Sequence, residues 1–330
     1  WAMLREIVRA GHELHYLALK TPDVTITDEE KHDRYATRKT WIDHREAAKG
    51  SPAFFLDLLG NFTLSRRPYV LDRYRCDAWR EAIEQHAKAA DVVVCDFLTP
   101  APNFEGLRLS CPVVLFQHNI ESQIWKRLAD TAGNAVKRAY LASQYRRMWR
   151  AEKELSEGFE GIITVSPEDS AFCREQYQLR RVLGDVPTGV DVDAFQPPAK
   201  PAAAPVIGFL GSMDWMPNID GVLWFAREVL PKVREQMPDV RVKIIGRNPP
   251  ASIRALAADL AIEVTGTVPE VQPHVHGCRV IAVPLLAGGG TRIKIFEAMA
   301  MGVPVISTTI GAEGLPVRHG EEIEIADDAE

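Results

Sequence analysis

The stretch GGGTRIKIFEAMAMG, residues Gly288–Gly302, decides how the second half of this chain folds. An apolar strand, RVIAVPL at 279–285, precedes it, and a second strand, PVISTT at 304–309, follows it. The glycines thus form a turn between a strand and a helix, and without Cβ atoms their N–H groups can come close to a ligand. A turn of this kind at the start of a helix favours an anion.

The charges that follow the glycines support the same interpretation. If the helix begins near Thr291, then Arg292 and Lys294 lie in its first turn, where the helix dipole disfavours cations unless a bound anion offsets them. A diphosphate would supply that anion, and Glu297 could bind two vicinal hydroxyls of a ribose. The alternative is a glycine-rich turn followed by a solvated, charged helix.

Strands and helices alternate upstream of this stretch. Apolar strands are predicted at 205–211, 241–246 and 262–266, with helices at 218–236 and 251–260 between them. The segment 187–205 is rich in proline and alanine and lacks periodicity, which is typical of an interdomain linker. We therefore place a domain boundary near Ala199.

The first half of the chain shows the same alternation. Strands at 91–98 and 112–119 are apolar throughout, as in parallel sheets covered on both faces, and a long helix is predicted at 135–157. A strand at 161–166 and a helix at 167–177 follow. Residues 20–72 have no clean period.

The chain opens within a predicted helix, with Trp1, Leu4, Ile7 and Val8 at helical spacing and Gly11 as its C-cap. An α/β domain normally starts with a strand and a loop, so we expect that the first strand and loop of this domain are missing.

Composition excludes several classes. The formal charge of −6 over 330 residues argues against nucleic-acid binding, which needs clustered Lys and Arg. Five scattered cysteines without a CxxC pair indicate neither a zinc site nor a disulfide framework, and a reducing cytoplasm fits best. No apolar run of about 18 residues occurs, so we expect at most peripheral membrane contact, at the inner face.

Several motifs together resemble the GT4-like glycosyltransferases (glycosyl transferases group 1). These are AMAMGVPVIST after Glu297, ITVSPEDSAF, GVDVDAF, GFLGSMDWMPNIDG and VKIIG. The resemblance implies a GT-B fold, in which two Rossmann-like βα domains face each other across a cleft. The first would be an acceptor-side domain at 1–198, and the second a nucleotide-sugar domain at 199–330. It also implies retention of configuration, a UDP- or GDP-sugar donor, no further cofactor and no metal.

Two departures from the family pattern shift the expected chemistry. Gly289 stands where the family has the first glutamate of an E-x7-E pair, so backbone amides at 289–291 are expected to take over its contact. The segment 211–221 lacks the cations that the family has there. We therefore expect Arg292 and Lys294, assisted by Arg247, to balance the charge of the leaving diphosphate. The expected donor-binding residues are Gly211, Arg247, Thr267, Val268, Gly288, Gly289, Gly290, Thr291 and Glu297. For Gly211 and Val268, ordinary packing of a βα turn is an equal alternative.

In the first domain, FQHNIESQIW places His118, Asn119 and Glu121 just past a strand end. The resemblance assigns such a histidine to the acceptor or donor-sugar side. His118 could bond to a sugar hydroxyl or the attacking oxygen, and Glu121 could orient it or accept a proton. A histidine satisfied within the structure is the alternative, and Asp96 at the neighbouring strand end has the same two interpretations.

Three further patterns carry less weight. Asp191 and Asp193 resemble a metal-binding DxD, but their place in the linker favours turn chemistry. His274 and His276 alternate as on a strand and have no third ligand nearby. The helix at 135–157 interleaves basic and aromatic residues, as a surface against anionic lipid would, although a solvated helix face is favoured.

We therefore predict an enzyme that transfers a sugar from a nucleoside-diphosphate donor to a saccharide or lipid-linked saccharide, of the kind that builds surface or exopolysaccharides. A nucleotide-sugar 2-epimerase and a non-catalytic nucleotide-sugar-binding subunit are the alternatives. A dinucleotide-dependent oxidoreductase is disfavoured because no GxGxxG follows a strand.

Overall fold

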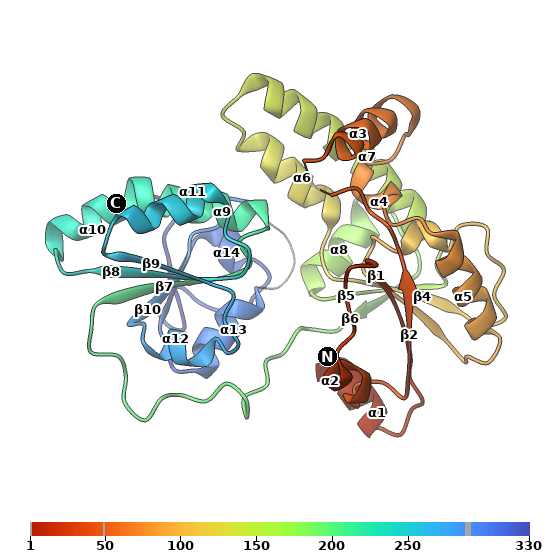
Figure 1. Cartoon of the computed structure of the whole chain (residues 1–330), viewed down its shortest axis with the longest axis horizontal. Helices are drawn as coiled ribbons and strands as arrows, with labels where there is room; N and C mark the ends of the chain where they lie inside the picture. The colour runs from red at the N-terminus through yellow and green to blue at the C-terminus, as the bar shows by residue number, and fades with distance from the viewer. Residues whose placement is uncertain (1, 49, 288–291) are drawn as a thin grey trace. The chain divides into compact units, whose positions relative to one another are not determined.

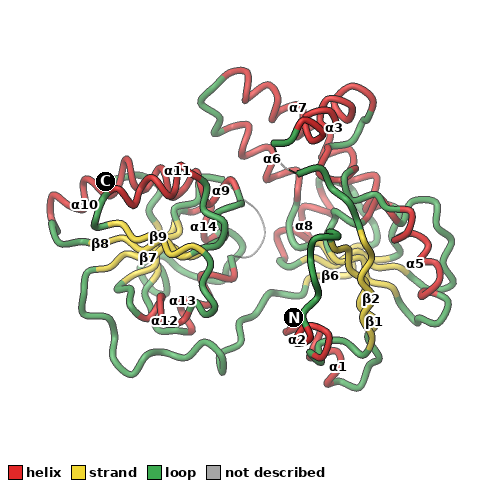
Figure 2. Tube along the Cα trace, in the orientation of Figure 1, coloured by secondary structure: helices red, strands yellow, loops and turns green. Residues whose placement is uncertain are grey.

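The computed structural model describes residues 2–48, 50–287 and 292–330, which form two compact units. Unit 1 comprises Trp1–Gln117, Arg146–Ile163 and Cys173–Gly184, and unit 2 comprises His118–Tyr145, Thr164–Phe172 and Asp185–Glu330. Residues 186–205, which connect β6 to β7 along the chain, contain no helix or strand (Figures 1 and 2). The boundary near Ala199 stays a prediction.

Unit 2 is built on a six-stranded parallel sheet in the order β12-β11-β10-β7-β8-β9. This is the order of a doubly wound Rossmann sheet, whose topological switch point lies between β7 and β10, and such sheets bind ligands at the carboxyl ends of the strands there. Its strands are β7 (Val206–Leu210), β8 (Arg241–Ile245), β9 (Ile262–Gly266), β10 (Val280–Val283), β11 (Val305–Ser307) and β12 (Glu324–Ile325).

Successive side chains on these strands enter cores on opposite faces of the sheet. Phe209 and Ile244 belong to one core and Leu210 and Ile245 to the other, so the central strands read as continuous apolar runs. The helices α9 (Met216–Trp224), α10 (Leu230–Gln236) and α11 (Ala251–Arg254) cover the first face, and α12 (Gln272–His276) and α13 (Ile293–Ala300) the second (Figure 1). The short α14 (Thr309–Ala312) also packs on the second face.

The predicted helix at 218–236 is interrupted by a π-helical segment, η2 (Phe225–Val229), between α9 and α10. Pro231 explains the interruption because proline has no N–H to continue the α-helical ladder. The predicted helix at 251–260 is similarly a short α11 followed by a 3-10 turn, η3 (Ala255–Ala258).

Two predictions about helix boundaries were wrong. His274 and His276 lie on α12 and not on a strand, because Pro273 occupies its first turn, where proline favours a helix start. Helix α13 begins at Ile293 and not near Thr291, so Arg292 is its N-cap residue and Lys294 alone of the two cations lies in its first turn.

In the first half of the chain, a four-stranded sheet has the order β3-β4-β5-β6, and β1 and β2 form a separate parallel pair. The strands are β1 (His15–Lys20), β2 (Arg38–Asp43), β3 (Val93–Asp96), β4 (Val113–Gln117), β5 (Gly161–Thr164) and β6 (Val182–Asp185). The helices are α1 (Ala2–Arg9), α2 (Asp28–His32), α3 (Pro52–Leu64), α4 (Tyr69–Asp72), α5 (Asp77–Ala87), η1 (Ala101–Asn103), α6 (Glu121–Asp130), α7 (Ala135–Glu157) and α8 (Pro167–Glu175).

Most sequence expectations for this half are confirmed, with one correction. Helix α7 has the predicted bounds, and Gly11 follows α1 with a φ of 91°, as its C-cap role requires. The strand β3, however, is not covered on both faces: it is an edge strand, and Val94 is 54% exposed. Trp1 lies outside the described residues.

Helix α7 directs large apolar side chains inward along its second half. Met148 is fully buried, and the Trp149 ring packs against Tyr177 with centroids 4.7 Å apart. Glu152, also fully buried, accepts hydrogen bonds from Gln117 and from the Tyr177 hydroxyl. The interleaved aromatic residues therefore form no continuous lipid-facing stripe on this helix, although Tyr140 is exposed. No helix in the described part of the chain is long and apolar enough to cross a membrane.

Candidate functional site

The candidate site lies at the switch point of the unit 2 sheet, where the segment after β7 meets the start of α13. Lys294 Nζ donates a hydrogen bond of 2.9 Å to Asn218 Oδ1. A Cβ atom added to Gly211 would lie only 2.7 Å from that same Nζ atom. Glycine at position 211 therefore leaves the space that the Lys294 ammonium occupies.

The backbone around Gly211 is held firmly. Its N–H donates to the Ile245 carbonyl at 3.0 Å, and Met213 N–H donates to the Arg247 carbonyl at 2.9 Å. A Cβ atom on Gly246 would lie 1.8 Å from the Gly211 carbonyl oxygen, so the two strand ends approach as closely as two glycines allow. The site thus rests on a rigid edge of the sheet.

Asn218 is a site residue that the sequence analysis missed. Its side chain is almost fully buried, and its Nδ2 donates to the Ser212 carbonyl at 2.7 Å while its Oδ1 accepts from Lys294. It therefore ties the ammonium to the loop after β7. The sequence offered one signal, an asparagine within the quoted motif GFLGSMDWMPNIDG, but only the fold shows its partners.

The electrostatics of the site favour an anion. Burial, and then the charge of Arg292, lower the pKa of Lys294 to about 7, while Glu297 opposes the shift. Burial likewise lowers the pKa of Arg292 to about 10 and raises the pKa of Glu297. The Lys294 ammonium lies 4.9 Å from the Phe209 ring centroid and the Arg292 guanidinium 5.7 Å from that of Trp215. These apolar neighbours give little solvation, so a bound anion would stabilise both cations.

The other predicted donor-binding residues are placed differently. Arg247 follows β8 and is 65% exposed; its Nε donates to Ser212 Oγ at 2.9 Å and lies 3.8 Å from Asp214 Oδ2. Thr267 is exposed just after β9, whereas Val268 packs against the core on the α13 side of the sheet. Gly288, Gly289, Gly290 and Thr291 lie outside the described residues.

His118 and Glu121 lie between the end of β4 and the start of α6. Asn119 Nδ2 donates to Glu121 Oε1 at 2.6 Å, and burial raises the pKa of Glu121 although this hydrogen bond opposes the shift. His118 is half-buried. Asp96, at the end of β3, is exposed. A carboxyl group with a raised pKa is suited to proton transfer, so this geometry is compatible with the role expected of Glu121.

The structure supports turn chemistry for the linker aspartates. Asp191 Oδ1 accepts from the N–H groups of Asp193 and Ala194, at 3.0 and 3.1 Å, which is an Asx turn. His276 Nε2 lies 3.0 Å from the Gln196 carbonyl oxygen. Among the residues that the structure describes, no three His, Cys, Asp or Glu side chains gather to hold a metal ion.

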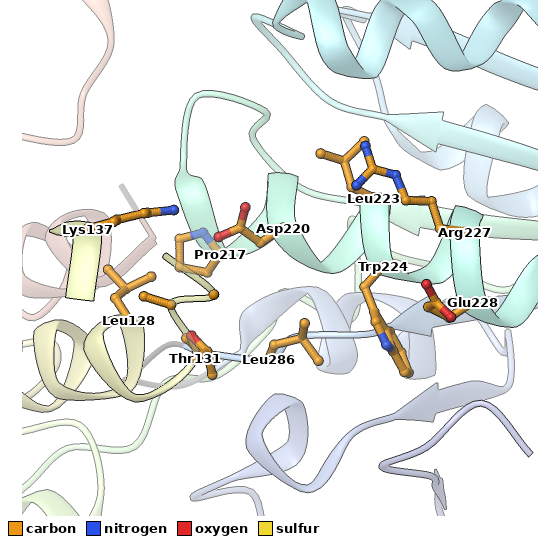
Figure 3. Close-up of a pocket in the computed structure, with 13 residues that line it drawn as sticks. Leu128, Thr131, Lys137, Pro217, Asp220, Leu223, Trp224, Arg227, Glu228 and Leu286 are labelled. Carbon is orange, nitrogen blue, oxygen red and sulfur yellow. The ribbon is translucent and has the colours of Figure 1, made fainter. Parts of the chain in front are cut away.

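A pocket of about 300 Å³ within unit 2 lies beside α9 (Figure 3). Its wall includes charged residues of both signs, among them Lys137, Asp220 and Arg227. None of the predicted site residues that the structure describes lines it, and its lining includes Ala287, which precedes Gly288 in the sequence.

Comparison with solved structures defines the fold. Sucrose-phosphate synthase from Thermosynechococcus elongatus is similar with a TM-score of 0.69 and 17% identity, over 99% of this chain and 79% of that one. HepE from Anabaena, solved with UDP-glucose, is similar with a TM-score of 0.60 and 14% identity, over 96% and 86%. These are GT-B glycosyltransferases, so the predicted fold of two Rossmann-like domains is confirmed.

The family follows from the sequence. Residues 204–330 match the family described as Glycosyl transferases group 1, the family that the motifs of the sequence resemble. The phosphatidyl-myo-inositol mannosyltransferase of Mycobacterium tuberculosis is 30% identical over 51% of this chain and 46% of its own length. An uncharacterised 44.6 kDa protein in the cps region of Klebsiella pneumoniae is 23% identical over 64% and 55%. The chain thus spans about half the length of these relatives.

Substitution of Gly211 by alanine tests the close approach of Lys294. The atoms nearest to the new Cβ are the ends of side chains, so the fold should persist while the ammonium is displaced. We expect Gly211→Ala to bind UDP at least about tenfold more weakly in calorimetric titration, the loss of one charge-assisted hydrogen bond. Gly189→Ala is the control, because its Cβ would meet no atom within 4 Å. Unchanged UDP affinity in Gly211→Ala would show that the site lies elsewhere.

The lowered pKa of Lys294 predicts pH-dependent UDP binding. Below about pH 7 the free protein carries the ammonium, and above it the amine must take up a proton when the diphosphate binds. The association constant should therefore fall between pH 7 and 9, by up to about tenfold per pH unit, a range in which the phosphate of UDP is already ionised. In Lys294→Gln the affinity should be weak and nearly constant across that range. A flat profile for the unsubstituted protein would contradict the assignment.

Proposed function

We propose that this chain is a retaining, metal-independent glycosyltransferase that uses a UDP- or GDP-sugar. The observation that carries the proposal is the buried Lys294 ammonium between Gly211 and Asn218, with Arg292 beside it, at the switch point of the nucleotide-binding type of sheet. Retention of configuration rests on the family resemblance. The donor class is supported by the similarity to HepE, which was solved with UDP-glucose.

The proposed chemistry is stabilisation of the leaving group. As the bond from the sugar to the diphosphate breaks, negative charge grows on the diphosphate, and Lys294 and Arg292 would neutralise it together with the start of α13. The low polarity around both cations strengthens this interaction relative to water. Glu297 would bind the ribose hydroxyls, and Arg247, exposed on the neighbouring loop, would assist at the diphosphate.

For the acceptor we propose a saccharide or lipid-linked saccharide of surface polysaccharide or glycolipid synthesis, reached from the cytoplasmic face of a membrane. The M. tuberculosis relative is named for phosphatidyl-myo-inositol, and the Klebsiella relative for its cps region. His118 would bond to a sugar or acceptor hydroxyl, and Glu121, whose pKa burial raises, would orient that contact or take up the proton.

Donor turnover tests the proposal. Release of UDP from UDP-glucose and of GDP from GDP-mannose is measured, with water or added phosphatidylinositol vesicles as acceptor. We expect Lys294→Ala to lower the turnover of the preferred donor by about 100-fold or more, the scale of losing one group that stabilises transition-state charge. Glu297→Ala should mainly raise the KM for the donor.

The matched control is Lys232→Ala, which removes an exposed lysine from α10 and should leave turnover unchanged. If both Lys294→Ala and Glu297→Ala retain full turnover, the site assignment is wrong. Conversion of the sugar without any acceptor would instead identify an epimerase. Tight UDP binding without release of diphosphate under any condition would identify a non-catalytic binding subunit.

A further inference from the structure

Helix α3 presents an unusually apolar outer surface. It begins at Pro52 behind Ser51, whose hydroxyl accepts from the Phe54 N–H at 3.2 Å, and none of its side chains is fully buried. Its outer face carries a row of large apolar side chains at helical spacing that we call the α3 stripe. Its members, with their exposed fractions, are Phe55 (60%), Leu56 (69%), Leu59 (59%) and Phe62 (46%). Leu64, which is 89% exposed, ends the helix about half a turn away from this row.

The opposite face holds α3 in place, so the stripe is a fixed surface. Phe54 packs against the Tyr69 ring at 5.7 Å, and Asn61 Nδ2 donates to Asp72 Oδ2 at 2.7 Å. On α7, the Arg147 guanidinium donates to the Phe62 carbonyl at 2.8 Å and lies 4.8 Å from the Phe62 ring centroid.

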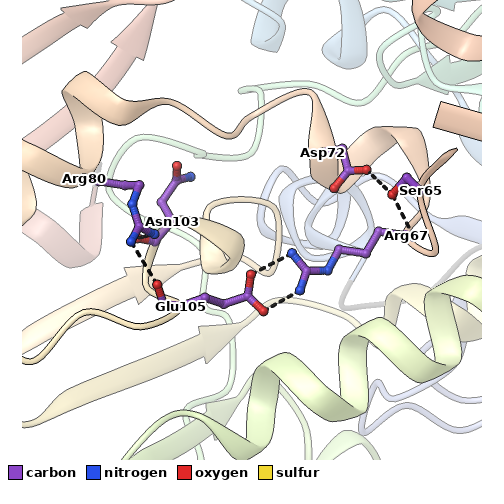
Figure 4. Close-up of polar contacts among 6 residues, drawn as sticks. All are labelled: Ser65, Arg67, Asp72, Arg80, Asn103 and Glu105. Carbon is purple, nitrogen blue, oxygen red and sulfur yellow. Dashed lines mark hydrogen bonds and ion pairs between the residues drawn. The ribbon is translucent and has the colours of Figure 1, made fainter. Parts of the chain in front are cut away.

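The turn after α3 is anchored as well (Figure 4). Ser65 donates to Asp72 and accepts from the Arg67 N–H, while Arg67 forms a bidentate pair with Glu105. Arg80 in turn donates to the Glu105 carbonyl at 2.9 Å. These contacts leave the stripe itself uncovered by the described residues of the chain.

The charges around the stripe are predominantly basic. Asp57 is the one acidic residue of α3. Arg66 is exposed two residues after Leu64, and Arg146 and Arg150 are exposed on α7 within one helical turn of Arg147, which contacts α3. An apolar row with arginines at its end matches a bilayer surface, where apolar side chains enter the acyl boundary and cations meet anionic headgroups.

We propose that the α3 stripe docks this chain on an anionic lipid surface, with Arg66, Arg146 and Arg150 against the headgroups. A second copy of the chain fits less well, because a two-fold contact through α3 would bring the same arginines together. The proposal rests on the proposed peripheral location of the enzyme and names the surface responsible. In this proposal α3 supplies the apolar contact and α7 contributes arginines only, because Met148 and Trp149 of α7 pack inward.

Vesicle co-sedimentation of the full chain tests the proposal, with vesicles of phosphatidylcholine alone and of phosphatidylcholine with phosphatidylglycerol. We expect binding to the anionic vesicles that weakens with added salt. The variant with Leu56→Asp and Leu59→Asp should bind at least about tenfold more weakly. The control Leu260→Asp, at a side chain that is 95% exposed in unit 2, should bind as the unsubstituted chain does.

Four readouts keep the outcomes distinct. Melting temperature and UDP affinity should be the same in the α3 variant and in the unsubstituted chain, so a failure of vesicle binding leaves the donor site untouched. Equal vesicle binding by the α3 variant and the unsubstituted chain overturns the proposal. So does a dimer in sedimentation velocity that the α3 variant abolishes while anionic vesicles bind neither protein.

Discussion

The chemistry assigned to this chain depends on one buried cation. The Lys294 ammonium lies near an aromatic ring and a glycine that leaves room for it, and among the described residues it donates one hydrogen bond, to the side-chain oxygen of Asn218. An ammonium in such surroundings loses hydration that one hydrogen bond replaces only in part, which is why its pKa falls to about 7. A bound anion would stabilise this ammonium, which is the basis for proposing Lys294 as a diphosphate-binding residue.

The doubly wound sheet brings these groups together. Gly211 follows β7 and Lys294 follows β10, and these two strands are neighbours at the switch point. The sheet thus brings together two residues that are 83 positions apart in the sequence. Phe209 and Leu210 are buried in cores on opposite faces of the sheet, and this packing holds the central strand in place. The chain after β7 must therefore emerge at the edge where α13 begins.

Sequence patterns predicted the elements with strong periodicity and missed those that depend on contacts made elsewhere. The bounds of α7 and the alternation in unit 2 follow from apolar spacing that the packed structure reinforces. The prediction of a strand at His274 and His276 was wrong. Two histidines at alternate positions are weak evidence for a strand, and Pro273 favours the start of a helix. Within the region 20–72, the segment that forms α3 gave no clear period because this helix is apolar on its exposed side as well as its inner side.

The site shows the same division. Arg292, Lys294 and Glu297 were predicted from charge next to a glycine turn, and the structure places all three at the start of α13, where the first two are buried cations. Asn218 escaped prediction because its importance lies in a partner 76 residues away. The exposure of β3 was likewise not predicted, because an apolar strand has the same sequence pattern whether or not a helix covers it.

A crystal structure of the chain with UDP tests the central claim most directly, through the distance from Lys294 Nζ to the nearest diphosphate oxygen. We predict a direct contact of about 3 Å, with the diphosphate between Gly211 and the start of α13. A diphosphate bound elsewhere in the chain, with Lys294 still bonded only to Asn218, would contradict the account.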